Sequence, residues 1–191
     1  MDMTRWLYRR RGAVTGPDGL AREGSYFADE FIRPDQIPPD WLKMSVKQFV
    51  RWLYNEGSYE GDPEQYKAVE HWEDPAEFIA RKLKGDCEAF AVTVASFLIA
   101  KGHPDTRICL GKKFHNKEAE VKESINHAWV LVYGHYPGKD TITLIDATAP
   151  RSKLLGWPYI KRAERSWGYK PYISFSRVVF LGDGAYFEHW R

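Results

Sequence analysis

The chain has 191 residues, of which 43% are hydrophobic and 28% are charged, a composition typical of a folded domain that buries a core without metal or disulfide staples. A net charge of +2 excludes the strong field expected of a nucleic-acid-binding protein, and two cysteines exclude a disulfide-rich framework. No apolar stretch approaches the roughly 18 residues of a membrane span, and the N-terminal residues lack a signal-peptide pattern. We therefore expect a soluble, cytoplasmic protein with no membrane or nucleic-acid partner; export without a signal stays open.

The sequence predicts one domain over residues 1–191, with an N-terminal arm and extension (1–44), a helical part (45–104) and a sheet part (105–191). Three helix starts share one pattern, a polar cap followed three residues later by Glu or Gln. These pairs are Ser45 with Gln48, Asp62 with Gln65, and Asp74 with Glu77. We expect the first helix to end near Gly57 and the third to extend over 75–84.

A fourth helix is predicted from Cys87 to about Lys101, capped by Asp86 and closed by Gly102. Its sequence, CEAFAVTVASFLIAK, is apolar on nearly every side, which indicates burial in the centre of the domain. Cys87 then lies on the first turn, where unpaired N–H groups and the helix dipole favour a thiolate. A buried structural cysteine is the alternative, and it is the role expected of Cys109.

Strands are predicted at 106–110, 127–133, 141–146 and within 172–181, each by β-branched and aromatic residues or by alternating apolar positions. Helices in the first half followed by strands in the second indicate an α+β fold with an antiparallel sheet packed against helices.

A nucleophilic Cys87 needs a base, and His127 is the one of six histidines that opens a strong strand. Residues 127 and 146 are equidistant from the centre of the loop between the two hairpin strands. The hairpin therefore predicts that His127 and Asp146 face each other directly, close enough for a hydrogen bond. The same register pairs Trp129 with Leu144 and Leu131 with Ile142, and a one-residue slip would destroy it.

Four segments carry a family resemblance: HWEDPAEF (71–78), GDCEAFA (85–91), NHAWV (126–130) and LIDAT (144–148). Through them the chain resembles the transglutaminase-like superfamily, and most closely the bacterial transglutaminase-like cysteine proteinases, over about half its length. The resemblance implies a papain-like core in which a central helix carries the cysteine. It also implies a catalytic triad of Cys87, His127 and Asp146.

Some members of the family bind calcium through acidic residues beside the cysteine, and Asp86 and Glu88 match those positions. The chain has Ala89 where a further acid is usual and Ala147 where an asparagine is usual. No other cofactor is expected, because metal-ligand spacings such as Cys-x-x-Cys are absent from the sequence. The two carboxylates also oppose a thiolate at Cys87.

An oxyanion hole would need a donor besides the Cys87 N–H, and the sequence offers Gln65, Trp52 and Trp72 as candidates. Packing is the alternative role for both tryptophans. A second aromatic set could line a substrate groove or simply pack: Trp157, Trp167, Tyr169 and Tyr172.

These features predict a cysteine-dependent acyl-transfer enzyme that hydrolyses a peptide or amide bond in a protein or peptide substrate. The charged connection at 112–126 favours hydrolysis, because a solvated loop would leave the His127 side open to water. Two alternatives stay open: a transglutaminase, in which an amine replaces water, and a non-catalytic binding or assembly module on the same fold. The sequence does not indicate an oligomeric state.

Overall fold

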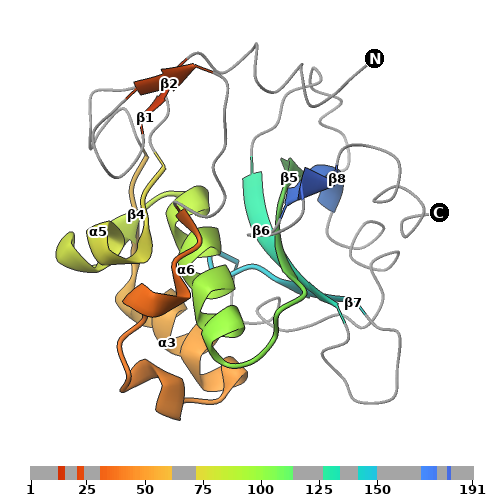
Figure 1. Cartoon of the computed structure of the whole chain (residues 1–191). Helices are drawn as coiled ribbons and strands as arrows, with labels where there is room; N and C mark the ends of the chain where they lie inside the picture. The colour runs from red at the N-terminus through yellow and green to blue at the C-terminus, as the bar shows by residue number, and fades with distance from the viewer. Residues whose placement is uncertain are drawn as a thin grey trace.

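The computed structural model describes residues 13–15, 21–23, 31–61, 72–113, 127–133, 142–149, 169–175 and 180–181. Helices gather on one side of a five-stranded antiparallel sheet, which confirms the α+β class (Figure 1). Helix α6 (Cys87–Ala100) packs against strands β5 (Thr106–Lys113) and β6 (His127–Tyr133) and contacts α5 (Pro75–Ala80) on its other side.

The predicted first helix is α3 (Val46–Glu56), and its capping box forms as expected. Ser45 Oγ accepts from the Gln48 N–H at 3.2 Å, and the Gln48 side chain accepts from the Ser45 N–H at 2.8 Å. The predicted second helix, after Asp62, lies outside the described residues.

The third helix, α5, begins at its predicted cap, where Asp74 Oδ1 accepts from the Glu77 N–H at 2.9 Å. The prediction that it continues to residue 84 is wrong, because Lys82 and Leu83 turn the chain with left-handed φ angles of 60° and 61°. The chain then enters β4 (Lys84–Gly85), which pairs in parallel with β3 (Ser58–Tyr59). A long-range pairing therefore overrides the local helical pattern.

Helix α6 begins and ends where the sequence predicts. Asp86 caps its first turn, and Gly102 follows its last residues with a φ of 88°, the left-handed geometry in which many helices end. Twelve of its fourteen residues are buried, from Cys87 to Leu98, as its apolar sequence indicates. Two short 3-10 turns, η1 (Pro34–Gln36) and η2 (Trp41–Lys43), contact it.

The larger sheet has the order β7-β6-β5-β8-β9. Strands β7 (Ile142–Ile145), β8 (Tyr169–Phe175) and β9 (Phe180–Leu181) complete it, so the predicted last strand is in fact an antiparallel pair. A separate hairpin joins β1 (Ala13–Thr15) to β2 (Ala21–Glu23).

The predicted register of the β6–β7 hairpin is wrong by two residues. Leu131 pairs with Leu144 and Tyr133 with Ile142, rather than Leu131 with Ile142 and Trp129 with Leu144. A shift of two residues keeps every side chain on its original face of the sheet, because the side-chain period of a strand is two. His127 and Asp146 are therefore diagonal neighbours rather than opposed ones.

The hydrophobic core joins α6 to one face of the sheet. Ala128, Val130 and Val132 contribute from β6, and Phe31, Ile32 and Ile37 come from the segment before α3. Phe49 of α3 stacks on Phe97 of α6 with ring centroids 3.8 Å apart. Within the described ranges, no helix is both long and apolar enough to cross a membrane.

Gly85 is expected to tolerate no side chain. A Cβ there would lie 2.6 Å from Ala89 Cβ, 2.9 Å from the Phe78 ring and 3.0 Å from Glu73 Oε2. Gly85→Ala should therefore push the start of α6 outward and lower the free energy of unfolding by about 1–3 kcal/mol, as overpacked cores do. Denaturant unfolding with Gly102→Ala as control measures this effect, since a Cβ at Gly102 meets nothing within 4 Å and only the left-handed φ is strained. If both variants lost the same free energy of unfolding, the steric explanation for Gly85 would be wrong.

Candidate active site

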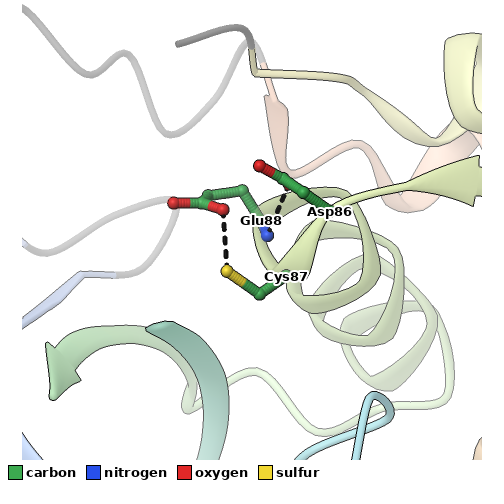
Figure 2. Close-up of side chains that lie close together, drawn as sticks. All are labelled: Asp86, Cys87 and Glu88. Carbon is green, nitrogen blue, oxygen red and sulfur yellow. Dashed lines mark hydrogen bonds between the residues drawn. The ribbon is translucent and has the colours of Figure 1, made fainter. Parts of the chain in front are cut away.

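Cys87 lies at the N-terminus of α6, directly after the capping residue. Asp86 Oδ1 accepts from the Glu88 N–H at 2.9 Å (Figure 2). It also accepts from the Ala89 N–H at 3.3 Å, and the two bonds fix the first turn. The Cys87 side chain is 5% exposed, and its thiol points at the Glu88 carboxylate. The local sequence Asp-Cys-Glu thus builds both the cap and the immediate surroundings of the sulfur.

The electrostatics around Cys87 favour the protonated thiol. Burial raises the pKa of Cys87 well above its usual value, and the charges of Glu88 and Asp86 raise it further. The thiol donates to Glu88 Oε2 at 2.9 Å, while the backbone N–H of Ala128 favours the thiolate. Burial and the two carboxylates outweigh the Ala128 N–H, so the pKa of the thiol is raised.

Glu88→Gln is expected to speed alkylation of Cys87 at pH 7.5, because it removes a negative charge beside the sulfur. At the reduced dielectric of a partly buried site, loss of this charge should raise the iodoacetamide rate by about fivefold or more. The rates are measured by mass spectrometry without divalent cations, with Glu56→Gln at the exposed end of α3 as the matched control. An unchanged rate in Glu88→Gln would mean that the carboxylate does not control the thiol.

His127 and Asp146 form a direct hydrogen bond. The Nε2–Oδ2 distance is 2.8 Å, and the exposed fractions are 8% for His127 and 1% for Asp146. An ionised carboxylate only accepts hydrogen bonds, so the imidazole carries its proton on Nε2. Nδ1 is then the nitrogen available to accept a proton. The predicted proximity of the two side chains is thus present despite the wrong register.

Asp146 has four further donor groups, from three residues, that sequence reasoning missed. Lys113 Nζ lies 2.6 Å from Oδ2, the Tyr169 hydroxyl donates to the same oxygen, and Thr148 donates to Oδ1 from its N–H at 2.9 Å and from Oγ1 at 2.7 Å. Burial raises the pKa of Asp146, but the charges and hydrogen bonds of His127 and Lys113 outweigh the effect of burial and hold this pKa far below its usual value. The carboxylate is therefore ionised at neutral pH.

Strand pairing brings these donors together. Gly111 of β5 is paired with His127 of β6, and Lys113, two residues further along β5, is paired with Tyr169 of β8. Lys113 Nζ also lies 3.4 Å from His127 Nε2 and 5.0 Å from the centre of the Tyr169 ring. Tyr169 is fully buried, which favours packing, the alternative that the sequence left open, over a place in a substrate groove. Trp157 and Trp167 lie outside the described residues, and the side chain of Tyr172 is not described.

The predicted oxyanion-hole side chains are placed as follows. Trp52 packs in an aromatic cluster with Trp41 and Phe49, at ring distances of 4.8 and 5.9 Å. Trp72 is fully buried against Phe31, with ring centroids 5.6 Å apart. Gln65 lies outside the described residues. These ring contacts give both tryptophans the packing role that the sequence also allowed.

Cys87 interacts with the residue that follows His127, and not with His127 itself, among the described interactions. The Cys87 sulfur lies against the N–H of Ala128, the residue that follows His127. In the part of the chain that the structure describes, the thiol hydrogen bond goes to Glu88, and no hydrogen bond joins Cys87 to His127. Asp86, Cys87 and Glu88 have their ligand atoms within 4.8 Å of one another, the one such group among the described residues.

A sequence model of the transglutaminase-like superfamily matches residues 33–140, more than half of the chain. The chain belongs to the transglutaminase-like superfamily. The matched segment includes Cys87 and His127 and ends before Asp146. The resemblance drawn from the four motifs is confirmed.

One solved structure of similar fold supports the assignment. LapG of Legionella pneumophila, solved after EGTA treatment, is 25% identical, with a TM-score of 0.52 over 76% of this chain and 72% of LapG. A candidate cysteine protease from Cytophaga hutchinsonii is 18% identical, with a TM-score of 0.46 over 69% of this chain and 43% of that one. A search of curated proteins gave no match. The papain-like α+β core predicted from the motifs is confirmed.

Proposed function

We propose that this member of the transglutaminase-like superfamily is a cysteine-dependent acyl-transfer enzyme that hydrolyses peptide or amide bonds. Cys87 is the nucleophile, His127 the general base and acid, and Asp146 the residue that orients the imidazole. The observation that carries the proposal is the 2.8 Å bond from His127 Nε2 to Asp146 Oδ2, next to a backbone N–H that contacts the Cys87 sulfur. A buried, ionised carboxylate on a histidine beside a cysteine has the geometry of a catalytic triad.

The reaction follows from the protonation states. His127 Nδ1 accepts the thiol proton as Cys87 Sγ adds to the substrate carbonyl carbon, and the resulting imidazolium gives that proton to the leaving amine. Water, activated by the same nitrogen, then hydrolyses the thioester and releases the acid. Asp146 holds the Nε2–H tautomer throughout, anchored by Lys113, Tyr169 and Thr148.

The described arrangement corresponds to a resting state of this cycle. The thiol donates to Glu88, so it must exchange that partner for His127 Nδ1 before attack. In this proposal the exchange is a rotation about the Cys87 side-chain bond toward β6, whose Ala128 N–H interacts with the sulfur.

Transglutamination is the second candidate function, because it begins with the same thioester and differs only in the acceptor. A non-catalytic module is the third. The dense set of donors on Asp146 argues against the third, since burying a carboxylate costs free energy that a silent domain has no need to offset.

The calcium site implied by the resemblance is compatible with the local geometry. The carboxylates of Asp86 and Glu88 lie side by side and offer hard oxygen ligands, although calcium takes about six to eight and the remainder would come from water or backbone carbonyls. A bound cation would neutralise negative charge beside Cys87. We propose Asp86 and Glu88 as its ligands, and no catalytic step depends on it.

The proposed activity is tested by digesting a denatured proteome with wild-type protein and with Cys87→Ala. New peptide termini that depend on Cys87 would support hydrolysis, and new isopeptide links that depend on Cys87 would support transglutamination. The absence of both products, with and without added calcium, would favour the non-catalytic module.

The partition between water and amine gives a further prediction. With an acyl donor and a primary amine at about 1 mM, we expect the acid product to exceed the amide, because water is present at far higher concentration and transfer needs a site that excludes it. The ratio is measured by liquid chromatography and mass spectrometry. The connection on which the sequence argument rests is 112–126. Its first two residues end β5, and residues 114–126 lie outside the described residues. Predominant amide would make transglutamination the better assignment.

A further inference from the structure

One oxygen of the Asp146 carboxylate interacts with three different side chains. His127 Nε2 lies 2.8 Å from Oδ2, Lys113 Nζ lies 2.6 Å from it, and the Tyr169 hydroxyl donates to it as well. The three side chains come from β6, β5 and β8, which lie side by side in the sheet. Lys113 also brings a positive charge close to the imidazole, which the orientation of His127 by a carboxylate does not require.

The Lys113 ammonium lies beside the imidazole ring. Its Nζ is 3.4 Å from His127 Nε2, and the Lys113 side chain is 12% exposed, so water and salt screen the two groups weakly. Strand pairing with Tyr169 fixes the place of Lys113, and the Tyr169 ring centre lies 5.0 Å from Nζ. Because Nε2 carries a proton that it donates to Asp146, the ammonium cannot donate to Nε2. The interaction between Lys113 and His127 is therefore one of charge.

The total charge of Lys113, His127 and Asp146 changes during the proposed cycle. While the imidazole is neutral, the charges of Lys113 and Asp146 balance. When His127 accepts the thiol proton, the three side chains hold two positive charges and one negative charge, and Lys113 repels the imidazolium at short range. Burial raises the pKa of Tyr169, so its hydroxyl adds no charge. Asp146 therefore stabilises the imidazolium, and Lys113 opposes it.

We propose that Lys113 is a positioning residue whose charge, held on Asp146 beside His127, favours transfer of the imidazolium proton to the leaving amine. The step is the collapse of the tetrahedral intermediate. The proton on Nδ1 moves to the amine nitrogen as the C–N bond breaks, the electron pair of that bond goes to nitrogen, and the carbonyl double bond reforms as the thioester. Lys113 keeps all of its protons, and the Nε2 proton stays on the bond to Asp146. This role rests on the proposed function.

The test compares a leaving group that needs a proton with one that does not. An amide and a nitrophenyl ester of the same peptide, identified by proteome digestion, are compared by kcat/KM, which reports acylation in both cases. Lys113→Met removes the charge and keeps the length of the side chain. The amide-to-ester ratio of kcat/KM should fall about tenfold or more, because the amide alone depends on the proton from the imidazolium. The ratio is taken within one variant, so it does not depend on the fraction of folded protein.

Further variants separate the charge of Lys113 from its support of the carboxylate. Lys113→Gln, which offers Asp146 a donor without a charge, should give the same fall in the ratio and replaces Lys113→Met if that variant does not fold. Lys113→Arg keeps the charge and should keep the ratio within about threefold of wild type. Tyr169→Phe removes a neutral donor from the same oxygen, so it should lower both rates and leave their ratio within about twofold.

Lys101→Met is the matched control, because Lys101 follows the last residue of α6 and its Nζ donates to the Leu42 carbonyl at 3.0 Å. Both rates should stay at wild-type values in that variant. An unchanged ratio in Lys113→Met or Lys113→Gln would overturn the proposal. An equal fall of the ratio in Lys113→Arg or Tyr169→Phe would overturn it too, because support of Asp146 would then explain the effect. A wild-type protein inert toward amide and ester alike would instead remove the proposed function itself.

Discussion

Cys87→Ala is expected to abolish amide hydrolysis, with a loss of kcat/KM of roughly 10⁴-fold or more, because no other group can form the thioester. The Cys87 thiol donates one side-chain hydrogen bond, to Glu88, and the side chain is small, so the variant should keep its fold and unfold cooperatively. Turnover of a peptide identified by proteome digestion measures the loss, and denaturant unfolding confirms the fold.

The second cysteine provides the matched control for this variant. Cys109 is fully buried in β5, where its sulfur approaches the carbonyl of Leu110 at 3.8 Å. Cys109→Ala should therefore lose some stability and retain kcat. If Cys87→Ala retained turnover while Cys109→Ala lost it, the assignment of the nucleophile would be wrong.

Asp146→Asn has the second largest expected effect, a fall in kcat of roughly 10³- to 10⁴-fold. The amide keeps the shape of the carboxylate but carries no charge, so it neither stabilises an imidazolium nor enforces the Nε2–H tautomer. It also removes the carboxylate that lies 2.6 Å from Lys113, and breaking a buried ion pair in this way costs about 3 kcal/mol of stability. Steady-state kinetics and urea unfolding measure the two effects.

The pH dependence of stability separates this variant from a merely destabilised one. The folded-state pKa of Asp146 lies far below the ordinary value near 4, so its contribution is present above that value and is lost as pH falls toward the folded-state pKa. The gap in unfolding free energy between wild type and Asp146→Asn should therefore narrow between about pH 5 and pH 2. Asp105→Asn, at an exposed pair with Arg107, is the control and should show no comparable gap. If the difference in unfolding free energy between wild type and Asp146→Asn did not change with pH, the conclusion that Asp146 is buried and ionised would be contradicted.

Local chemistry made the start of α6 predictable. Asp86 caps the helix and CEAFAVTVASFLIA is apolar throughout, so the burial of the helix and the place of Cys87 followed from the sequence. The proximity of His127 and Asp146 was predictable for a similar reason, because successive side chains of a strand alternate between the two faces of the sheet. The register was wrong by two residues because it assumed a loop symmetric about its midpoint, whereas the observed pairs centre one residue later.

Contacts that depend on distant strand pairs were not predictable. Lys113 belongs to a charged stretch that we expected to be solvated, and the sequence left Tyr169 open between a groove and packing. Both nevertheless bind Asp146, because β5 lies between β6 and β8. Tyr59 lies opposite Gly85, two residues before Cys87, only through the parallel pairing of two-residue strands, which no periodicity of the sequence indicates. The direction of the Cys87 pKa shift likewise could not be predicted without the position of the Glu88 carboxylate relative to the sulfur.

The most direct test of the account is the capture of the acyl-enzyme. Wild-type protein is mixed with an activated peptide ester, quenched in acid within the first turnover and analysed by intact-mass and peptide mass spectrometry. The account predicts one added acyl mass, located on the peptide that contains Cys87 and released by neutral hydroxylamine, with none on Cys87→Ala. Acylation at Cys109, or steady turnover of the ester that is equal in wild type and Cys87→Ala, would contradict it.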